Sequence, residues 1–376
     1  MHILIAPNAF KNSLTASDAA EAILIGLKQS RLHFSYECFP IGDGGNGTAE
    51  LIIKRNKGRL VYGKVHDPLG REITAGFGLI DEGKTAVIEM ADAAGLQFLN
   101  PDELNPLQTT SFGCGELIGL ALNEGIHKII LGMGGSATVD GGAGILRALG
   151  IRFLNADEDG LPDKPETMAA LAAIDLSGLD KRILECDLTI LCDVDNPLLG
   201  EKGAATVFGP QKGATKEGVK KLEASLAKFT EIALHQTGKD MASVKLGGTA
   251  GGAAAGLHTF LNAKLVNGID HFLHTTGFDE ALAKSDLVIT GEGSIDEQTL
   301  QGKGPYGVAS RAKKKGLPVI ALAGKVPLKE NKALCKYFDA LLTIGNGPTD
   351  LLTAMKATRE NLIRTSATIG NLLTLS

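Results

Sequence analysis

The stretch KIILGMGGSATVDGGAG, from Lys128 to Gly144, decides how the rest of the chain is interpreted. Its first residues, 129–131, form an apolar run typical of a buried strand, and residues 145–149 have the pattern of a helix. Glycines and short polar residues lie between them: Gly132, Gly134, Gly135, Ser136, Thr138, Asp140, Gly141 and Gly142. A strand that leads through such a loop into a helix presents N–H groups and hydroxyls, so the stretch predicts an anion-binding site.

A tight strand-to-helix turn without a ligand is the alternative interpretation of this stretch. The loop lacks the Gly-Lys-Ser/Thr ending of a Walker A motif, and it does not match the GxGxxG pattern of dinucleotide-binding proteins. The anion-binding interpretation gains weight because other loops of the same kind occur along the chain.

Two such loops lie near the N-terminus. An apolar strand at 3–6 precedes PNAFKNS, and a helix at 16–28 follows, with Thr15 or Ser17 as its N-cap. A second strand at 36–41 leads into GDGGNGT and another helix. Ligands of open α/β sheets bind at the carboxyl ends of the strands, so both loops are expected at a ligand-binding edge.

The distribution of strand patterns predicts the architecture. Strands at 59–66, 71–78 and 85–90 have the character of an antiparallel meander, whereas alternating strands and helices return after Phe278. We therefore predict a flavodoxin-like doubly wound parallel sheet formed by both chain ends, residues 1–58 and 278–376, with strand order 2-1-3-4-5. Residues 59–277 are predicted to form an inserted mixed α/β domain.

Composition excludes several classes of function. The chain has no tryptophan, 5% aromatic residues and a net charge of −5, so neither stacking platforms nor a basic surface for nucleic acid is expected. No apolar run is long enough to span a membrane, and the N-terminus does not resemble a signal peptide. The five cysteines lack CxxC spacing, which favours a reduced, cytoplasmic protein.

The residues at the expected strand ends are suited to phosphoryl transfer. Lysines lie in or beside the polar loops, and carboxylates follow the strands: Lys11, Lys212, Lys303, Lys325, Asp43, Asp193, Asp195, Glu292 and Asp296. Cations hold phosphates, carboxylates hold Mg²⁺, and one carboxylate accepts the proton of the attacking hydroxyl. Taken singly, each lysine has a solvated surface charge as its alternative, and each acid a turn or a cap.

Other activities have weaker support. No GxSxG motif surrounds a serine, and the first strand is not followed by GxGxxG, which disfavours serine hydrolysis and nicotinamide binding. A non-catalytic protein that closes two domains on a small acid remains an alternative, although it has less need for the acidic residues.

Taken together, the loops resemble the type I glycerate kinase family along essentially the whole chain. The stretches that carry this resemblance are 6–16, 40–48, 86–96, 134–144, 193–214, 248–257 and 286–309. The resemblance implies a flavodoxin-like domain with a restriction-endonuclease-like insert, and ATP- and Mg²⁺-dependent phosphorylation of D-glycerate. The implied product is 2-phosphoglycerate, with 3-phosphoglycerate as the alternative. Asn8, Ala9, Gly42 and Asn46 depart from the commoner family pattern.

We assign roles to these residues as hypotheses. Asp193 is the proposed general base, with Lys11 and Asp43 also catalytic, and Glu292 and Asp296 are the proposed Mg²⁺ ligands. Substrate or nucleotide is expected to contact Ser13, Gly44, Gly45, Gly134, Gly135, Ser136, Thr138, Asn196, Lys212 and Lys303. The expected partners are glycerate and ATP, with no nucleic acid or membrane partner and with a homodimer left open.

Overall fold

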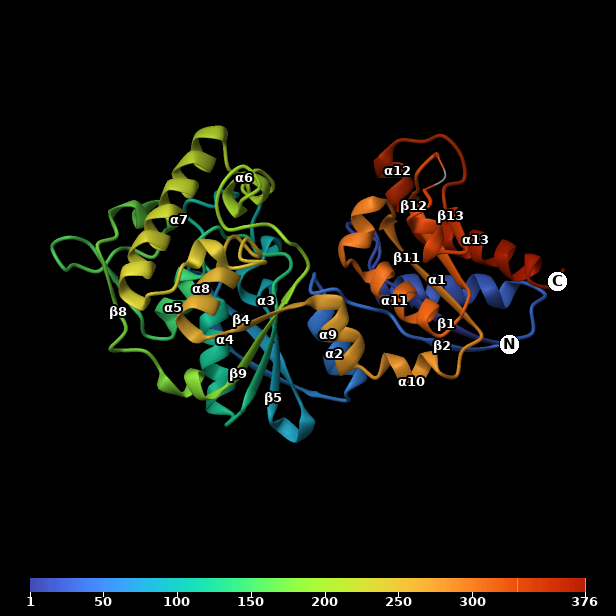
Figure 1. Cartoon of the computed structure of the whole chain (residues 1–376), viewed down its shortest axis with the longest axis horizontal. Helices are drawn as coiled ribbons and strands as arrows, with labels where there is room; N and C mark the ends of the chain where they lie inside the picture. The colour runs from blue at the N-terminus through green and yellow to red at the C-terminus, as the bar shows by residue number, and fades with distance from the viewer. Residues whose placement is uncertain (330, 376) are drawn as a thin grey trace. The chain divides into compact units, whose positions relative to one another are not determined.

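The structure is a computed structural model that describes residues 1–329 and 331–375. The chain divides into two compact units. We call Met1–Asp43 together with Ile269–Ser376 the terminal unit, and Gly44–Gly268 the central unit. Figure 1 shows both chain ends, blue and orange to red, within the terminal unit.

The terminal unit is built on a five-stranded parallel sheet with the order β13-β12-β11-β1-β2. The first strand is buried almost throughout, as its apolar run predicts, and Ile3 pairs with Leu287 in the neighbouring strand. The predicted strand order 2-1-3-4-5 is confirmed. The strands are β1 (His2–Pro7), β2 (Ser35–Cys38), β11 (Leu287–Ser294), β12 (Val319–Lys325) and β13 (Ala340–Thr343).

Helices pack on this sheet. The first and last helices lie side by side and share a hydrophobic core with the strands (Figure 1). Thr15 caps the first helix by accepting a hydrogen bond from the amide of Asp18, as predicted. The helices are α1 (Ala16–Gln29), α9 (Gly268–Thr275), α10 (Phe278–Leu282), α11 (Gly304–Lys314), α12 (Leu351–Lys356) and α13 (Thr358–Leu372), with 3₁₀ turns η7 (Glu297–Gln301) and η8 (Leu334–Lys336).

The central unit contains a mixed six-stranded sheet in the order β10-β9-β6-β5-β4-β3. The first three of its strands along the chain form an antiparallel meander, and the others pair in parallel. The strands are β3 (Arg59–His66), β4 (Glu72–Ile80), β5 (Thr85–Glu89), β6 (Lys128–Gly132), β9 (Asp187–Cys192) and β10 (Lys264–Asn267), with a separate antiparallel pair of β7 (Arg152–Leu154) and β8 (Ala173–Asp175).

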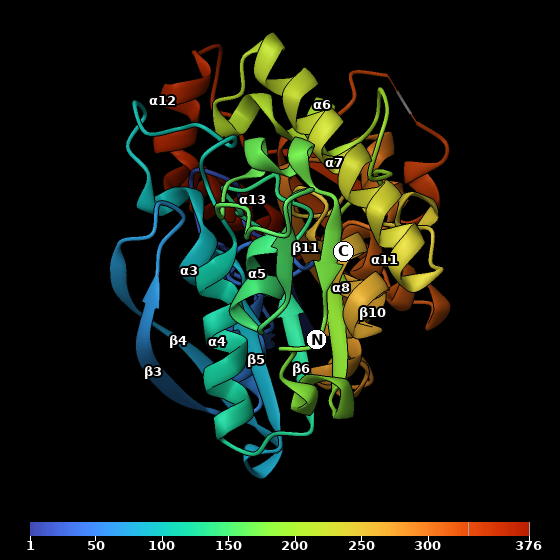
Figure 2. The ribbon, with the colours of Figure 1, turned by 90° about the vertical axis from the view of Figure 1, so that its left-hand side faces the viewer.

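One extended hydrophobic core stabilises the central unit. Leu117 and Ile118 in α4 are fully buried together with Ile88 and Leu131 of the sheet, and Figure 2 shows α4 and α5 in front of these strands. The helices are α2 (Thr48–Arg55), α3 (Ala91–Ala94), α4 (Phe112–Asn123), α5 (Ala143–Ala148), α6 (Ala204–Phe208), α7 (Lys216–Thr237) and α8 (Ala253–Leu261). The 3₁₀ turns are η1 (Asp81–Gly83), η2 (Leu96–Phe98), η3 (Pro165–Ala170), η4 (Lys181–Glu185), η5 (Pro210–Lys212) and η6 (Met241–Ser243).

The unit boundaries differ from the predicted positions at residues 58 and 277. Helix α2 packs against β4, β5 and β6, so it belongs to the central unit although it follows a strand of the terminal unit. At the other boundary, Ile269 of α9 lies so close to Gly307 of α11 that a Cβ on Gly307 would come within 2.6 Å of it. Contacts between elements that are distant in the sequence thus determine both unit boundaries. The change in strand pattern along the sequence did not reveal them.

Some elements also differ in length from the prediction. The last helical stretch, expected at 348–363, is two helices, α12 and α13, and the second continues to Leu372. Strand β2 ends at Cys38, although Phe39 and Ile41 still donate backbone hydrogen bonds to the first strand. Among the described residues, no helix combines the length and apolar character needed to cross a membrane.

Candidate active site

The carboxyl ends of β1, β2 and β11 carry a group of polar residues in the terminal unit. We define the acid–lysine cluster as Asn8, Lys11, Asp43, Glu292 and Lys303. The Asn8 amide donates a hydrogen bond of 2.8 Å to the Asp43 carboxylate. The charge of Asp43 acts on Glu292, as do the opposite charges of Lys11 and Lys303. Strands β1 and β11 flank the point where the strand order reverses, which is the usual ligand site of open α/β sheets.

Glu292 is the buried charged residue of this cluster. Its side chain accepts a hydrogen bond of 3.2 Å from the Thr299 hydroxyl. Burial raises the pKa of Glu292 to about 7, and Asp43 adds to this rise, while Lys303 and Lys11 lower the pKa. A buried carboxylate of this kind is stabilised in its ionised form when a cation binds beside it.

Two residues predicted for this site have structural partners instead. Asp296 caps η7 by accepting a hydrogen bond of 2.9 Å from the amide of Gln298, and Thr299 completes a capping box. The hydroxyl of Ser13 donates to the backbone carbonyl of Met355, which ties the first loop to α12. The structure therefore gives Asp296 and Ser13 roles in local folding.

In the central unit, the loop that follows β6 packs against the loop that precedes α2. We call residues Gly134–Thr138 the anion loop. The amide of Gly134 donates to the carbonyl of Gly44 at 3.1 Å, and a Cβ on Gly134 would come within 2.5 Å of Gly45. Gly135 has a φ of +70°, which favours glycine. The four predicted glycines thus allow two loops to approach closely.

Lys212 lies buried beneath the anion loop, in η5. Its Nζ donates to the Ser136 hydroxyl at 2.9 Å and to the Thr138 carbonyl at 2.7 Å. Burial lowers the pKa of Lys212 to about 7, and the negative charges of Asp140 and Asp193 oppose this shift. The lysine therefore fixes the loop and supplies a positive charge that its surroundings only partly compensate.

Two hydroxyls of the anion loop are buried and have a proton that no described residue is shown to accept. Because Ser136 accepts a hydrogen bond from Lys212, its own proton remains available for donation. The Thr138 hydroxyl is fully buried and has no hydrogen-bond partner among the described residues. A buried hydroxyl without a partner is costly, and a ligand atom that accepts its proton would remove that cost.

The loop after β9 contains two further predicted residues. Asp193 directly follows the strand, is half-buried and lies close enough to Lys212 to affect its pKa. Asn196 instead stabilises a turn, since its amide donates to the carbonyl of Lys202 at 2.8 Å. Of the two, only Asp193 is brought into the surroundings of the anion loop.

Two acidic residues that received no role from the sequence hold these loops in place. Asp140 accepts hydrogen bonds from Ser111 and from the amides of Gly142 and Gly144, at the start of α5. Glu89, at the end of β5, accepts from the amides of Gly47 and Ala49, and burial raises its pKa to about 7. Its position as the last residue of an apolar strand, comparable to that of Asp193 directly after one, is the signal that could have identified Glu89.

The residues present can contribute to a magnesium site only in combination with a substrate. Within residues 1–329 and 331–375, no cluster of three or more histidine, cysteine, aspartate or glutamate side chains is arranged to hold a metal. Magnesium in kinases is commonly bound by one or two carboxylates together with substrate phosphates. Asp43 and Glu292, which interact electrostatically, fit this requirement.

A buried carboxylate beside lysines at strand ends, and a glycine loop above a buried lysine, define an α/β enzyme suited to anionic substrates. The chain matches the model of the glycerate kinase family over residues 3–374. It is 47% identical to glycerate kinase of Halalkalibacterium halodurans, over 86% of this chain and 85% of that protein. Identity to glycerate 2-kinase of Escherichia coli K12 is 40%, over 100% and 98% of the two chains.

A comparison with solved structures also indicates the glycerate kinase family. A crystal structure from Salmonella typhimurium LT2, assigned to glycerate kinase 2, matches with a TM-score of 0.83 and 41% identity, covering 100% of this chain and 98% of that one. The chain belongs to the glycerate kinase family. The predicted resemblance, the mixed α/β fold and the kinase activity are thereby confirmed.

Proposed function

We propose that the chain transfers the γ-phosphoryl group of ATP to the 2-hydroxyl of D-glycerate and releases 2-phosphoglycerate and ADP. The relative from Escherichia coli carries the name glycerate 2-kinase, which supports this choice of hydroxyl. The observation that carries the proposal is a pair of complementary sites: a buried carboxylate in the terminal unit and a buried lysine in the central unit. The first suits a metal-bound nucleotide and the second suits the carboxylate of glycerate.

In the terminal unit, Lys11 and Lys303 would neutralise the phosphates of ATP. Lys303 directly precedes α11, whose N-terminus adds a partial positive charge. Asp43 and Glu292 would hold Mg²⁺, which neutralises the charge that develops on the phosphoryl oxygens when it is bound. This choice replaces Asp296, because its carboxylate caps η7.

In the central unit, the anion loop would bind the carboxylate of glycerate through the hydroxyls of Ser136 and Thr138, with Lys212 supplying the counter-charge. Asp193 would accept the proton of the 2-hydroxyl as its oxygen attacks the γ-phosphorus atom. Its position at the end of a buried strand supports this role, because a rigid element holds a proton acceptor in place.

Finer features of the protein belong to the same proposal. The strand order 2-1-3-4-5 supports a flavodoxin-like description of the terminal unit. The restriction-endonuclease-like description of the central unit follows from the family resemblance alone. All five cysteines are free thiols, which supports a cytoplasmic location.

Proton-coupled phosphorus NMR of the product formed from ATP and D-glycerate tests this function. Phosphorus on the 2-oxygen couples to one proton and gives a doublet, whereas phosphorus on the 3-oxygen couples to two protons and gives a triplet. We expect the doublet. A triplet would indicate the 3-phosphate, and tight glycerate binding without any product would favour a small-acid binding protein.

A further inference from the structure

An apolar cavity of about 180 Å³ lies in the terminal unit, between β12 and β13. Parallel strands are usually joined by a crossover helix, which covers one face of the sheet. Among the described residues of the connection between β12 and β13, the only helical element is the three-residue turn η8, which is much shorter than a usual crossover helix. The apolar residues that line the cavity are Val326, Pro327, Leu328, Leu334, Phe338 and Leu341. We call it the β12–β13 pocket.

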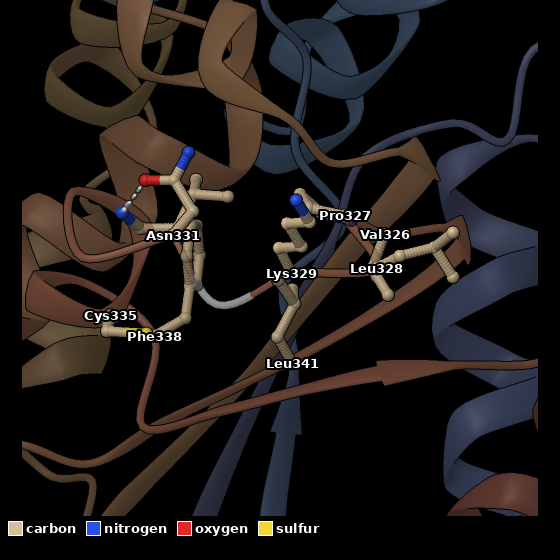
Figure 3. A pocket seen from close by; sticks show the side chains of 9 residues that line it. Val326, Pro327, Leu328, Lys329, Asn331, Cys335, Phe338 and Leu341 are labelled. Carbon is tan, nitrogen blue, oxygen red and sulfur yellow. Dashed lines mark hydrogen bonds between the residues drawn. The ribbon is translucent and has the colours of Figure 1, made fainter.

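The polar side chains of this pocket are those of Lys329, Asn331 and Cys335, and of these Asn331 is engaged in hydrogen bonds. Asn331 donates its amide hydrogen to Glu297 at 2.9 Å, and its amide oxygen accepts from the amides of Ala333 and Leu334. Leu328 is fully exposed, which is unusual for a leucine beside an apolar cavity. Figure 3 shows residues 326–328 on one side of the pocket and Asn331 and Cys335 on the other.

The pocket is connected to the acid–lysine cluster through neighbouring strand ends. Strand β11, which carries Glu292, pairs with β12 up to Ser294 and Lys325. Beyond this pair, the amide of Ile295 donates to the carbonyl of Lys325 at 3.0 Å, directly before the pocket residue Val326. The pocket and the acid–lysine cluster therefore lie at the same edge of the sheet, on neighbouring strands.

We infer that the β12–β13 pocket binds the aromatic base of the nucleotide whose phosphates lie at the acid–lysine cluster. The inference rests on the proposed function, and it assigns the whole nucleotide to the terminal unit. The cavity is smaller than the ~300–1,000 Å³ of sites that enclose drug-sized ligands, so it accommodates the base alone. Its apolar lining, which includes the aromatic ring of Phe338, suits the faces of a planar ring, and Lys329 is a polar residue at the same pocket.

Cys335 provides a direct probe of occupancy, because it lines the pocket and is exposed while Cys114 and Cys192 are buried. The experiment follows alkylation of Cys335 by iodoacetamide with peptide mass spectrometry. We expect ADP at ten times its Kd to slow alkylation about tenfold, since only the free fraction reacts. Adenosine at a higher concentration should also protect the thiol, whereas inorganic tripolyphosphate and D-glycerate should not.

The control ligands separate the possible results. Protection by tripolyphosphate would mean that phosphate binding shields the thiol, and protection by ADP without adenosine would mean that the base is not responsible. Either result, or no protection by ADP, overturns the inference. Because this assay needs no glycerate turnover, a failure of the proposed kinase reaction in the NMR experiment remains a separate finding.

A matched pair of variants extends the test to kinetics. Cys335→Trp fills the pocket from its rim, and Lys336→Trp places the same side chain on the neighbouring exposed residue of η8. Base stacking contributions predict that Cys335→Trp raises the KM for ATP about 5- to 100-fold. Its kcat, its KM for glycerate and its Tm should match those of Lys336→Trp. An unchanged KM for ATP in a folded Cys335→Trp protein contradicts the inference.

Discussion

The acid–lysine cluster of the terminal unit and the anion loop of the central unit each contain one buried ionisable group, and the two groups have opposite charges. In the terminal unit a buried carboxylate, Glu292, has its pKa raised to about 7, and in the central unit a buried ammonium, Lys212, has its pKa lowered to about 7. Burial is the main cause in both cases, so each group gains most from a ligand of opposite charge. The comparison therefore supports the proposal that Mg²⁺ binds in the terminal unit and the glycerate carboxylate in the central unit.

The largest effect is expected at Asp193. If this residue accepts the proton of the attacking hydroxyl, Asp193→Asn should lower kcat by about 10²- to 10⁴-fold. The KM for ATP and the Mg²⁺ requirement should stay near the wild-type values, because the proposed function places ATP and Mg²⁺ in the terminal unit. Steady-state kinetics of Asp195→Asn, an exposed aspartate two residues further on, provides the control. If Asp193→Asn instead has a lower Tm but normal turnover per folded molecule, Asp193 only stabilises a turn.

Lys212→Met should have the next largest effect. Loss of a charged hydrogen-bond donor predicts a fall in kcat/KM for glycerate of roughly 100-fold. The exposed Lys216 gives the matched control, Lys216→Met, for which we expect normal kinetics.

The pH dependence distinguishes this role from simple packing. In the wild type the KM for glycerate should rise above pH 7, where Lys212 loses its charge in the folded protein. The unfolded chain keeps that proton to a higher pH, so folding stability should increase from pH 7 towards 10.5. Lys212→Met should lack both changes. A KM that stays constant across this range in the wild type would mean that Lys212 only supports the loop.

The sequence predicts the terminal sheet well because its signals are local. Apolar runs such as Ile3–Ala6 and Leu287–Thr290 favour buried strands, and the helices between successive strands favour parallel pairing, as observed for these two. The sequence also predicts the start of α2, but it does not show to which unit this helix belongs. That depends on packing against β4, β5 and β6, which lie later in the chain.

For the site, the sequence shows which residues lie at strand ends but not what each side chain contacts. Asp193 and Asp296 look equivalent in the sequence, yet Asp296 satisfies amides of its own turn. Lys212 looked like one loop lysine among several, and only the fold buries it beneath Ser136. Glu89 carries the strand-end signal as well, but the sequence does not show that the amides of Gly47 and Ala49 will donate to it.

In the terminal unit, Glu292→Gln should raise the Mg²⁺ concentration required for half-maximal activity about tenfold, with partial rescue by Mn²⁺. Asp296→Asn is the matched variant, and we expect it to leave the Mg²⁺ requirement unchanged. For the wild type, the requirement should rise below pH 7, because Glu292 is then protonated. Metal titrations of activity at several pH values measure these effects.

Stability gives a second test of the same residue. The folded protein holds the Glu292 proton up to about pH 7, whereas the unfolded chain releases it near 4.5, so wild-type stability falls between these values. Glu292→Gln should avoid that loss, and its Tm should exceed the wild-type Tm at pH 8 but not at pH 4, by about 2–4 °C for each kcal/mol. An increased Mg²⁺ requirement in Asp296→Asn but not in Glu292→Gln would restore Asp296 as the metal ligand.

The smallest effect is expected at Thr138, and it concerns whether the anion loop binds substrate through its hydroxyls. Thr138→Val removes a buried hydroxyl that has no partner among the described residues, so the free protein should become more stable. If this hydroxyl donates to the glycerate carboxylate, the KM for glycerate should at the same time rise about fivefold, which corresponds to one neutral hydrogen bond.

Thr109→Val is the matched control, because Thr109 is equally buried but donates its proton to the carbonyl of Ala137, within the anion loop, at 2.9 Å. This control should lose stability, because the carbonyl is left without its donor, while its KM for glycerate stays close to the wild-type value after correction for folded protein. If Thr138 binds substrate, the Tm values of the two valine variants therefore shift in opposite directions, and only Thr138→Val raises the KM for glycerate. A Thr138→Val protein that is more stable and has an unchanged KM would show that the hydroxyl takes no part in binding, and it would restrict the anion-binding role to Ser136 and Lys212.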